Sequence, residues 1–275
     1  MITRRDFLKV TGVAAAAAAL TACGGSSSTA SSTASSAAAS SEAASAAATE
    51  LTTVEAGKLT MATNAAFPPY EMTTDAGEFE GIDIETAQAI ADKLGLELQI
   101  DDMDFDAALL SVQQGKADIV MAGVTVTDER KAVMDFSDSY ATGIQSIIVP
   151  NDSDIASPDD LAGKKIGTQR GTTGYIYCSD DFGDDAVVAY DNGLTAVQAL
   201  NNGQVDAVVI DNAPAKEYVA ANPGLAILDT SYAEEDYAIG MAKGSSLEAA
   251  VNAALEELKA DGTLQSIVDK YITAE

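Results

Sequence analysis

The 275-residue chain has no histidine and only two cysteines, Cys23 and Cys178. A cysteine acts as a nucleophile only as the thiolate, and a histidine is the usual base that forms it. Because no histidine is present, we interpret Cys178 as a packing residue. The same absence removes the commonest general acid and base, and no Asp or Glu stands out to replace it. The sequence therefore predicts no catalytic residues and no cofactor.

Basic residues are scarce, with 15 Lys and Arg against 43 Asp and Glu, a net charge of −28. Nucleic acid binds proteins through clustered Lys and Arg, so this balance excludes it as a partner. The acidic stretch at residues 180–185 does not have the alternating spacing of a calcium-binding loop. We interpret it as a solvated loop and predict no metal site.

Long apolar runs are also missing, since residues 10–20 near the N-terminus provide only 11 residues, too few to span a bilayer. This run follows a twin-arginine sequence, TRRDFLK, at residues 3–9, and ends in a lipobox-like Leu-Thr-Ala-Cys at residues 20–23. We interpret residues 1–23 as a lipoprotein signal peptide, with diacylglycerol attached at Cys23 after cleavage. The arginine pair alone does not decide whether the protein is exported by the twin-arginine or by the general secretory pathway.

Residues 24–54 are dominated by Ser, Ala, Gly and Thr, a composition that cannot form a core. A flexible tether of this size has a root-mean-square span of roughly 30 Å. The sequence thus predicts an extracytoplasmic, membrane-anchored protein whose folded part begins near residue 55. With Cys23 lipidated, Cys178 has no disulfide partner.

The folded part alternates helix and strand periodicities, which indicates an α/β protein. Residues 82–94 repeat apolar side chains at steps of three and four, and Gly95 ends the helix. Residues 96–100 alternate as a half-buried strand, residues 105–114 form a second helix, and residues 117–123 are an apolar strand of a parallel sheet. A capping box of Ser245 with Glu248 is expected to begin a later helix.

Two lobes are expected, each a mainly parallel sheet flanked by helices. Residues 109–121 align without gaps on residues 197–209, so the helix-glycine-strand unit occurs twice. The strand at residues 144–149 is expected to cross into the second lobe, and the chain is expected to return to the first lobe near Tyr237, where residues 238–242 form a strand. The predicted lobes are residues 55–142 with 236–275, and residues 143–235, joined by a two-segment hinge.

Ligands of open α/β sheets bind beyond the carboxyl ends of strands, where this chain has Gly123, Thr125 and Arg130. Arg130 offers a fork that can bind a carboxylate through two hydrogen bonds. The alternative is an exposed Arg130 that pairs with Asp128 or Glu129.

The second lobe offers similar positions. Thr172 and Thr173 lie where a helix N-terminus would present N–H groups and hydroxyls to an anion. Asp211 follows a buried strand, where it caps the next helix or pairs with an ammonium group.

The segments GIDIETAQAIADKLG, FDAALLSVQQGKADIVMAGVTVTDER and DFSDSY resemble the polar amino-acid-binding proteins of ATP-driven importers, solute-binding protein family 3. The likeness covers residues 58–271. It implies a type II periplasmic-binding-protein fold, without enzymatic activity, that binds an amino acid between its lobes and delivers it to a membrane permease.

The resemblance also assigns roles at the site. It implies that Arg130, Gly123 and Thr125 hold the α-carboxylate, with Thr172 or Thr173 adding a donor, and that Asp211 binds the ammonium group. Phe67 and Phe105 would sandwich the ligand side chain. Many relatives have an acid where this chain has Asn64, which disfavours a cationic ligand. With Gln169 nearby, a neutral polar amino acid such as glutamine or cystine is favoured, and an acidic one stays open if Arg170 points inward.

Two alternatives to transport remain on sequence grounds. One is a ligand-sensing subunit for a membrane receptor; in either role the protein is expected to be a monomer. The other is a dehydratase-like enzyme on the same fold, which the absence of histidine disfavours.

Overall fold

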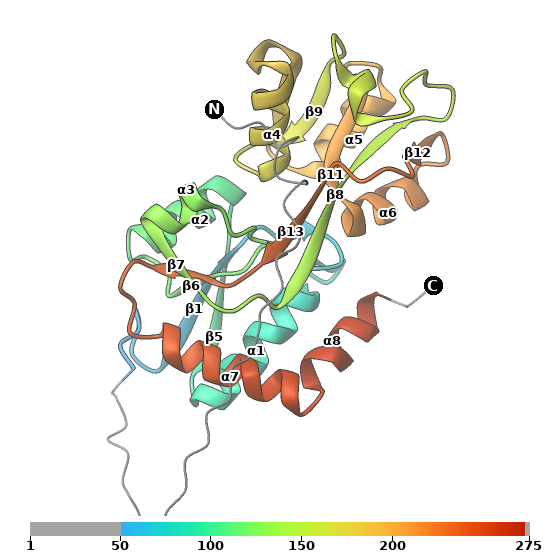
Figure 1. Cartoon of the computed structure of the whole chain (residues 1–275). Helices are drawn as coiled ribbons and strands as arrows, with labels where there is room; N and C mark the ends of the chain where they lie inside the picture. The colour runs from blue at the N-terminus through green and yellow to red at the C-terminus, as the bar shows by residue number, and fades with distance from the viewer. Residues whose placement is uncertain (1–50, 273–275) are drawn as a thin grey trace, which may run out of the picture. The chain divides into compact units, whose positions relative to one another are not determined.

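The computed structural model describes residues 51–272. The expected signal peptide, Cys23 and most of the linker lie outside the described residues. Within them, no helix is both long and apolar enough to cross a membrane. The described chain forms two main sheets flanked by helices, joined through two strands (Figure 1).

The first sheet has the order β5-β1-β6-β14-β7. Its strands are β1 (Lys58–Thr63), β5 (Glu97–Asp102), β6 (Ile119–Val120), β7 (Met134–Phe136) and β14 (Gly240–Ala242). Strand β1 runs parallel to β5 and β6, whereas β14 runs antiparallel to β6 and β7. A small sheet of β2 (Ala66–Phe67), β3 (Glu71–Thr73) and β4 (Phe79–Glu80) accompanies it.

Helices cover both faces of the first sheet because its strands are apolar on both faces. Leu59 and Met61 pack on one face with residues of α1 (Ile82–Leu94), α7 (Glu248–Ala260) and α8 (Thr263–Tyr271). Ala62 and Val120 pack on the other face with α2 (Phe105–Gln113). Gly95 ends α1 in the left-handed conformation, as its position in the sequence predicts.

The second sheet has the order β10-β9-β11-β8-β12, with β13 also paired to β8. Its strands are β8 (Ala141–Pro150), β9 (Ile166–Gln169), β10 (Val187–Tyr190), β11 (Ala207–Asp211), β12 (Leu225–Ile227) and β13 (Ala233–Tyr237). Helices α4 (Thr173–Phe182), α5 (Gly193–Asn201) and α6 (Asn212–Ala221), with the 3-10 turns η2 (Pro158–Leu161) and η3 (Asp184–Ala186), flank it. Strand β9 pairs parallel with β10 and β11, whereas β8 pairs antiparallel with all three of its partners.

Strands β8 and β13 carry the chain between the two sheets. They pair antiparallel from Ala141↔Tyr237 to Gln145↔Ala233 and run side by side between the sheets in Figure 1. The lobe boundaries expected from the sequence fall inside these two strands and stay a prediction.

Two local expectations were wrong. The apolar stretch at residues 117–123 forms only the two-residue strand β6, with one parallel and one antiparallel neighbour, although residues 117–122 are all buried. Ser245 and Glu248 make no capping box: α7 begins at Glu248, and the Ser245 hydroxyl oxygen instead accepts the Leu247 N–H at 3.2 Å. The chain turns once more before the helix begins, which places Glu248 too early in the helix for that motif.

Candidate functional site

A cavity lies where the carboxyl ends of the central strands of both sheets meet. All ten residues that the sequence predicts as ligand contacts line it: Asn64, Phe67, Phe105, Gly123, Thr125, Arg130, Gln169, Thr172, Thr173 and Asp211. Six further residues complete the lining: Glu71, Ala122, Gln145, Val209, Ile210 and Tyr237. The structure therefore brings the predicted residues together, and their binding of a ligand stays a prediction.

Arg130 is buried, with 8% of its surface exposed, in the short helix α3 (Asp128–Val133) that Thr127 caps. One guanidinium nitrogen, Nη1, donates to the Thr125 carbonyl at 2.7 Å, and Nη2 donates to the Gly171 carbonyl of the second sheet's loop at 3.1 Å. The guanidinium carbon lies 5.4 Å from the ring centre of Phe105. The expected alternative, an exposed arginine on the helix surface, is therefore wrong.

The Arg130 guanidinium has donors to spare. It carries five N–H groups, of which two are used by the carbonyls, so the fork can still donate into the cavity. Burial lowers the pKa of the guanidinium, and the negative charge of Glu235 opposes that shift. Arginine stays protonated at neutral pH even so. The site therefore contains a fixed, buried positive charge.

Asp211 supplies a buried carboxyl group from the end of β11, with 2% of its surface exposed. Its Oδ1 accepts the Ala213 N–H at 3.1 Å and so caps α6, as expected. Its Oδ2 accepts the Ile144 N–H at 2.9 Å and the Tyr237 hydroxyl at 2.7 Å. Burial raises the pKa of Asp211 to about 6, partly offset by these hydrogen bonds.

Two threonines that reach the cavity from different elements share one partner. The hydroxyls of Thr125 and Thr173 both donate to Oε2 of Glu235, at 3.0 and 2.9 Å. Gln145 donates to the same oxygen at 3.1 Å. Thr172 is the N-cap of α4, as its position predicts, because its hydroxyl oxygen accepts the Tyr175 N–H.

Two amide side chains of the cavity lining bind each other. Gln169 donates to the Asn64 side-chain oxygen at 2.9 Å, and the Asn64 amide donates to the Met103 carbonyl at 2.9 Å. Arg170 faces away from this contact, since its guanidinium pairs with Asp191 at 3.5 Å and its side chain is 53% exposed. Arg170 is absent from the cavity lining, so the basis for an acidic ligand is missing.

The apolar wall of the cavity is close-packed around Gly123, whose φ of 55° is left-handed. A Cβ atom at this position would lie 2.8 Å from the ring of Phe67 and 3.1 Å from that of Tyr237. Phe67 in turn stacks on Tyr70 with ring centres 5.7 Å apart. Glycine is therefore required here, by conformation and by space together.

Sequence reasoning missed Glu71, which begins β3 and is fully buried. Neither carboxyl oxygen receives a hydrogen bond from an N–H or hydroxyl donor of the described residues. Its contact is Asp83 of α1, also fully buried, whose Oδ2 accepts the Gly123 N–H at 3.0 Å and the Tyr140 hydroxyl at 2.8 Å. Two carboxyl groups that touch in a buried place share a proton.

Burial is the main cause of the high proton affinity of this carboxyl pair. It raises the pKa of Glu71 well above its ordinary value and that of Asp83 to about 6. No local pattern marks Glu71, because its carboxyl group is buried against Asp83 of α1, a tertiary contact that the residues around Glu71 do not encode.

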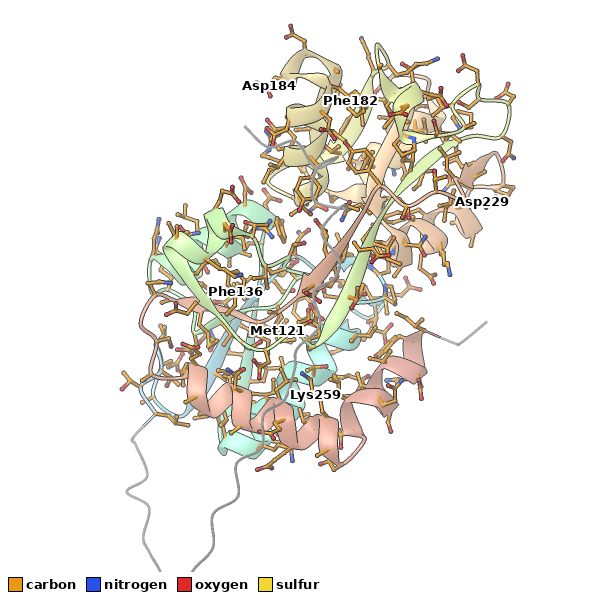
Figure 2. All side chains as sticks on the ribbon, in the orientation of Figure 1. Met121, Phe136, Phe182, Asp184, Asp229 and Lys259 are labelled. Carbon is orange, nitrogen blue, oxygen red and sulfur yellow. The ribbon has the colours of Figure 1, made fainter. Side chains whose placement is uncertain are left out.

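The acidic stretch at residues 180–185 lies away from the cavity. Figure 2 shows Asp184 at the outer end of α4, and the residue is exposed. Among the described residues, no group of three or more acidic or cysteine side chains is arranged to hold a metal ion.

Comparison with known proteins gives consistent matches along the chain. Residues 59–274 match the bacterial extracellular solute-binding proteins, family 3, and residues 1–21 match the twin-arginine translocation pathway signal sequence. The L-cystine-binding protein TcyJ of Escherichia coli K12 is 33% identical over 80% of this chain and 85% of its own length. The arginine-binding extracellular protein ArtP of Bacillus subtilis is 33% identical over 79% of this chain and 87% of its own length.

Solved structures agree with the observed architecture. An ancestral arginine-binding protein bound to glutamine is 42% identical, covering 79% of this chain and 99% of that one, with a TM-score of 0.76. The arginine-, lysine-, histidine-binding protein ArtJ of Geobacillus stearothermophilus is 34% identical, covering 79% and 96%, with a TM-score of 0.76. The fold is the type II periplasmic-binding-protein fold, as expected. The chain belongs to the bacterial extracellular solute-binding proteins, family 3.

Proposed function

We propose that this protein binds an α-amino acid in the cavity and delivers it to the permease of an ATP-driven importer. The observation that carries the proposal is a buried guanidinium, Arg130 of helix α3, and a buried carboxyl, Asp211 at the end of strand β11, that line one cavity. A zwitterion is costly to bury unless each of its charges is matched, and these two groups offer the matching charges. The lobes at residues 55–142 with 236–275, and 143–235, would close by bending of β8 and β13.

The charge of the ligand's side chain is a narrower question. Here Glu71, which the sequence did not mark, alters the preference for a neutral ligand. The preference for a neutral ligand rested on uncharged lining residues, among them Asn64 and Gln169, whose amides are already bound to each other and, for Asn64, to the Met103 carbonyl. Glu71 instead offers carboxyl oxygens with no N–H or hydroxyl donor. We therefore favour a cationic amino acid of the arginine type. Glutamine is the second candidate, because a Glu71 that holds the proton it shares with Asp83 can donate to a side-chain carbonyl.

Ligand binding to the purified mature protein tests this proposal. Excess L-arginine is expected to raise the melting temperature, because a ligand at about 1,000 times its Kd adds about 4 kcal/mol to the free energy of unfolding. For a domain of this size that corresponds to a shift of roughly 8–16 °C. L-Lysine, L-glutamine, L-cystine and L-glutamate complete the panel. If no amino acid shifts the melting temperature, the proposed function is wrong, and recovery of an altered ligand would indicate an enzyme.

Acid is expected to weaken recognition of the ligand's ammonium group, because burial gives Asp211 a pKa of about 6. The carboxylate is present above pH 6 and is lost as the pH falls, at about tenfold per unit. The measurement is the ratio of the affinities for L-arginine and 5-guanidinopentanoate, which lacks the α-ammonium group. This ratio cancels the effects of Glu71 and Asp83 on the side chain. A ratio that stays constant from pH 7 to pH 4.5 would remove Asp211 from ammonium binding.

The membrane anchor belongs to the same proposal. The twin-arginine match ends at residue 21, two residues before Cys23. Lipidation is supported by the lipobox-like residues 20–23 and the linker that follows them. Two acyl chains would hold the protein beside its permease while the linker lets the folded part move. The intact mass of the mature protein isolated from cells tests the attachment.

A further inference from the structure

Glu235 is a buried acid on a strand whose neighbouring acids are exposed. Strand β13 alternates, so that Glu234 and Asp236 face solvent while Glu235 is only 6% exposed. Its Oε2 accepts hydrogen bonds from Thr125, in the loop after β6, from Thr173, the first residue of α4, and from Gln145 on β8. One oxygen atom therefore joins both sheets at the cavity.

These contacts fix the direction of two hydroxyl hydrogens. A carboxylate oxygen can only accept, so the hydrogens of Thr125 and Thr173 must point toward Glu235. The other oxygen of Glu235 is buried without a hydrogen-bond partner among the described residues, so all three donors gather on Oε2. Three donors on one oxygen are the arrangement of an accepting carboxylate.

The lone pairs of both threonine hydroxyls therefore face the cavity. Thr125 and Thr173 line the cavity, and their hydroxyl oxygens lie 3.4 Å apart. With its hydrogen committed, each hydroxyl can only accept a hydrogen bond from a ligand. Such a pair suits an ammonium group and not a carboxylate, which is the reverse of the hydroxyl role expected from the sequence.

We propose that Glu235 is a positioning residue of the amino-acid site, which turns the Thr125 and Thr173 hydroxyls so that both accept from the ligand's α-ammonium group. This inference rests on the proposed function. Glu235 acts through the threonines, while Asp211 supplies the charge that the ammonium meets. The carboxylate of the ligand is left to Arg130 and to backbone N–H groups.

Glu235→Gln is the test, because glutamine keeps the size but carries an amide nitrogen that donates. That nitrogen would occupy a threonine lone pair or force a hydroxyl to turn. Affinity for L-arginine, measured by isothermal titration, is expected to fall about 10- to 100-fold, the worth of a hydrogen bond to a charged group. Affinity for 5-guanidinopentanoate, measured by competition, is expected to stay within about twofold. Glu234→Gln, the exposed neighbour, is the matched control and should change neither value.

The outcomes separate the inference from the proposed function. If the wild-type protein binds neither L-arginine nor L-glutamine, the function itself fails; if it binds only L-glutamine, glutaramic acid replaces 5-guanidinopentanoate as the probe. Equal weakening of both ligands by Glu235→Gln would show a merely structural role, and an unchanged L-arginine affinity would also overturn the inference.

Two further variants decide the matter if Glu235→Gln does not fold. Thr125→Val and Thr173→Val each remove one hydroxyl and should each lower L-arginine affinity while sparing 5-guanidinopentanoate. If Glu235→Gln does fold, its effect and those of the threonine variants should not add, because they remove the same interaction. If the threonine variants weaken binding of both L-arginine and 5-guanidinopentanoate, or of neither, the inference is wrong.

Discussion

Arg130→Met is expected to weaken L-arginine binding by at least about 100-fold. The guanidinium is buried in the cavity, and removing one partner of a buried charge pair leaves the other without compensation, at a cost of about 3–5 kcal/mol. That free energy corresponds to roughly 150- to 5,000-fold in affinity. Methionine keeps much of the side-chain volume against Phe105, so the loss reports the charge and not a cavity.

Two controls isolate that effect. Arg170→Met removes an equal charge from an exposed arginine that pairs with Asp191 outside the cavity, and it should leave affinity unchanged. Agmatine, which is arginine without its carboxylate, should bind weakly and equally to the wild type and Arg130→Met. The Thr125 and Gly171 carbonyls lose a donor in this variant, so its melting temperature without ligand is needed to separate unfolding from lost recognition. Wild-type affinity in Arg130→Met would remove Arg130 from the site.

The part of the site formed by the loop after β6 and by α3 could be predicted because local patterns encode it. Gly123, Thr125 and Arg130 lie within eight residues after one apolar segment, and a strand's carboxyl end is where α/β sheets bind ligands. The caps at Gly95 and Thr172 were likewise set by residue type and position. Such features depend on neighbours in sequence, so they can be predicted when tertiary contacts are unknown.

The two acids that shape the interior could not be predicted in the same way. Glu235 looks like its exposed neighbours Glu234 and Asp236, and only its partners on three other elements make it a buried acceptor. Glu71 follows a short aromatic segment and is buried against Asp83 of α1. The length of β6 also depended on its neighbours in the sheet. The apolar run at residues 117–123 therefore predicted a longer strand than the one that forms.

Glu71→Gln is expected to lower L-arginine affinity by about 100-fold while changing L-glutamine affinity only a few-fold. Glu71 can release its proton and pair with a bound guanidinium, whereas the amide of the variant leaves that cation unpaired; the amide side chain of L-glutamine can hydrogen-bond equally well to the variant. Glu80→Gln, on the exposed adjoining strand β4, is the matched control and should have no effect. If L-arginine binds the variant as tightly as the wild type, Glu71 does not select the side chain.

The same substitution should not cost stability, and this separates a selector from a structural residue. Burial raises the pKa of Glu71 well above its ordinary value, so the folded state holds a proton that the unfolded state releases as the pH rises above about 4.5. Stability is therefore lost as the pH rises from that value toward the folded-state pKa. In Glu71→Gln the amide can donate to the Oδ1 of Asp83, which has no other hydrogen-bond partner among the described residues. The ligand-free variant should melt at or above the wild-type temperature at pH 7, while a lower melting temperature would show that Glu71 stabilises the fold.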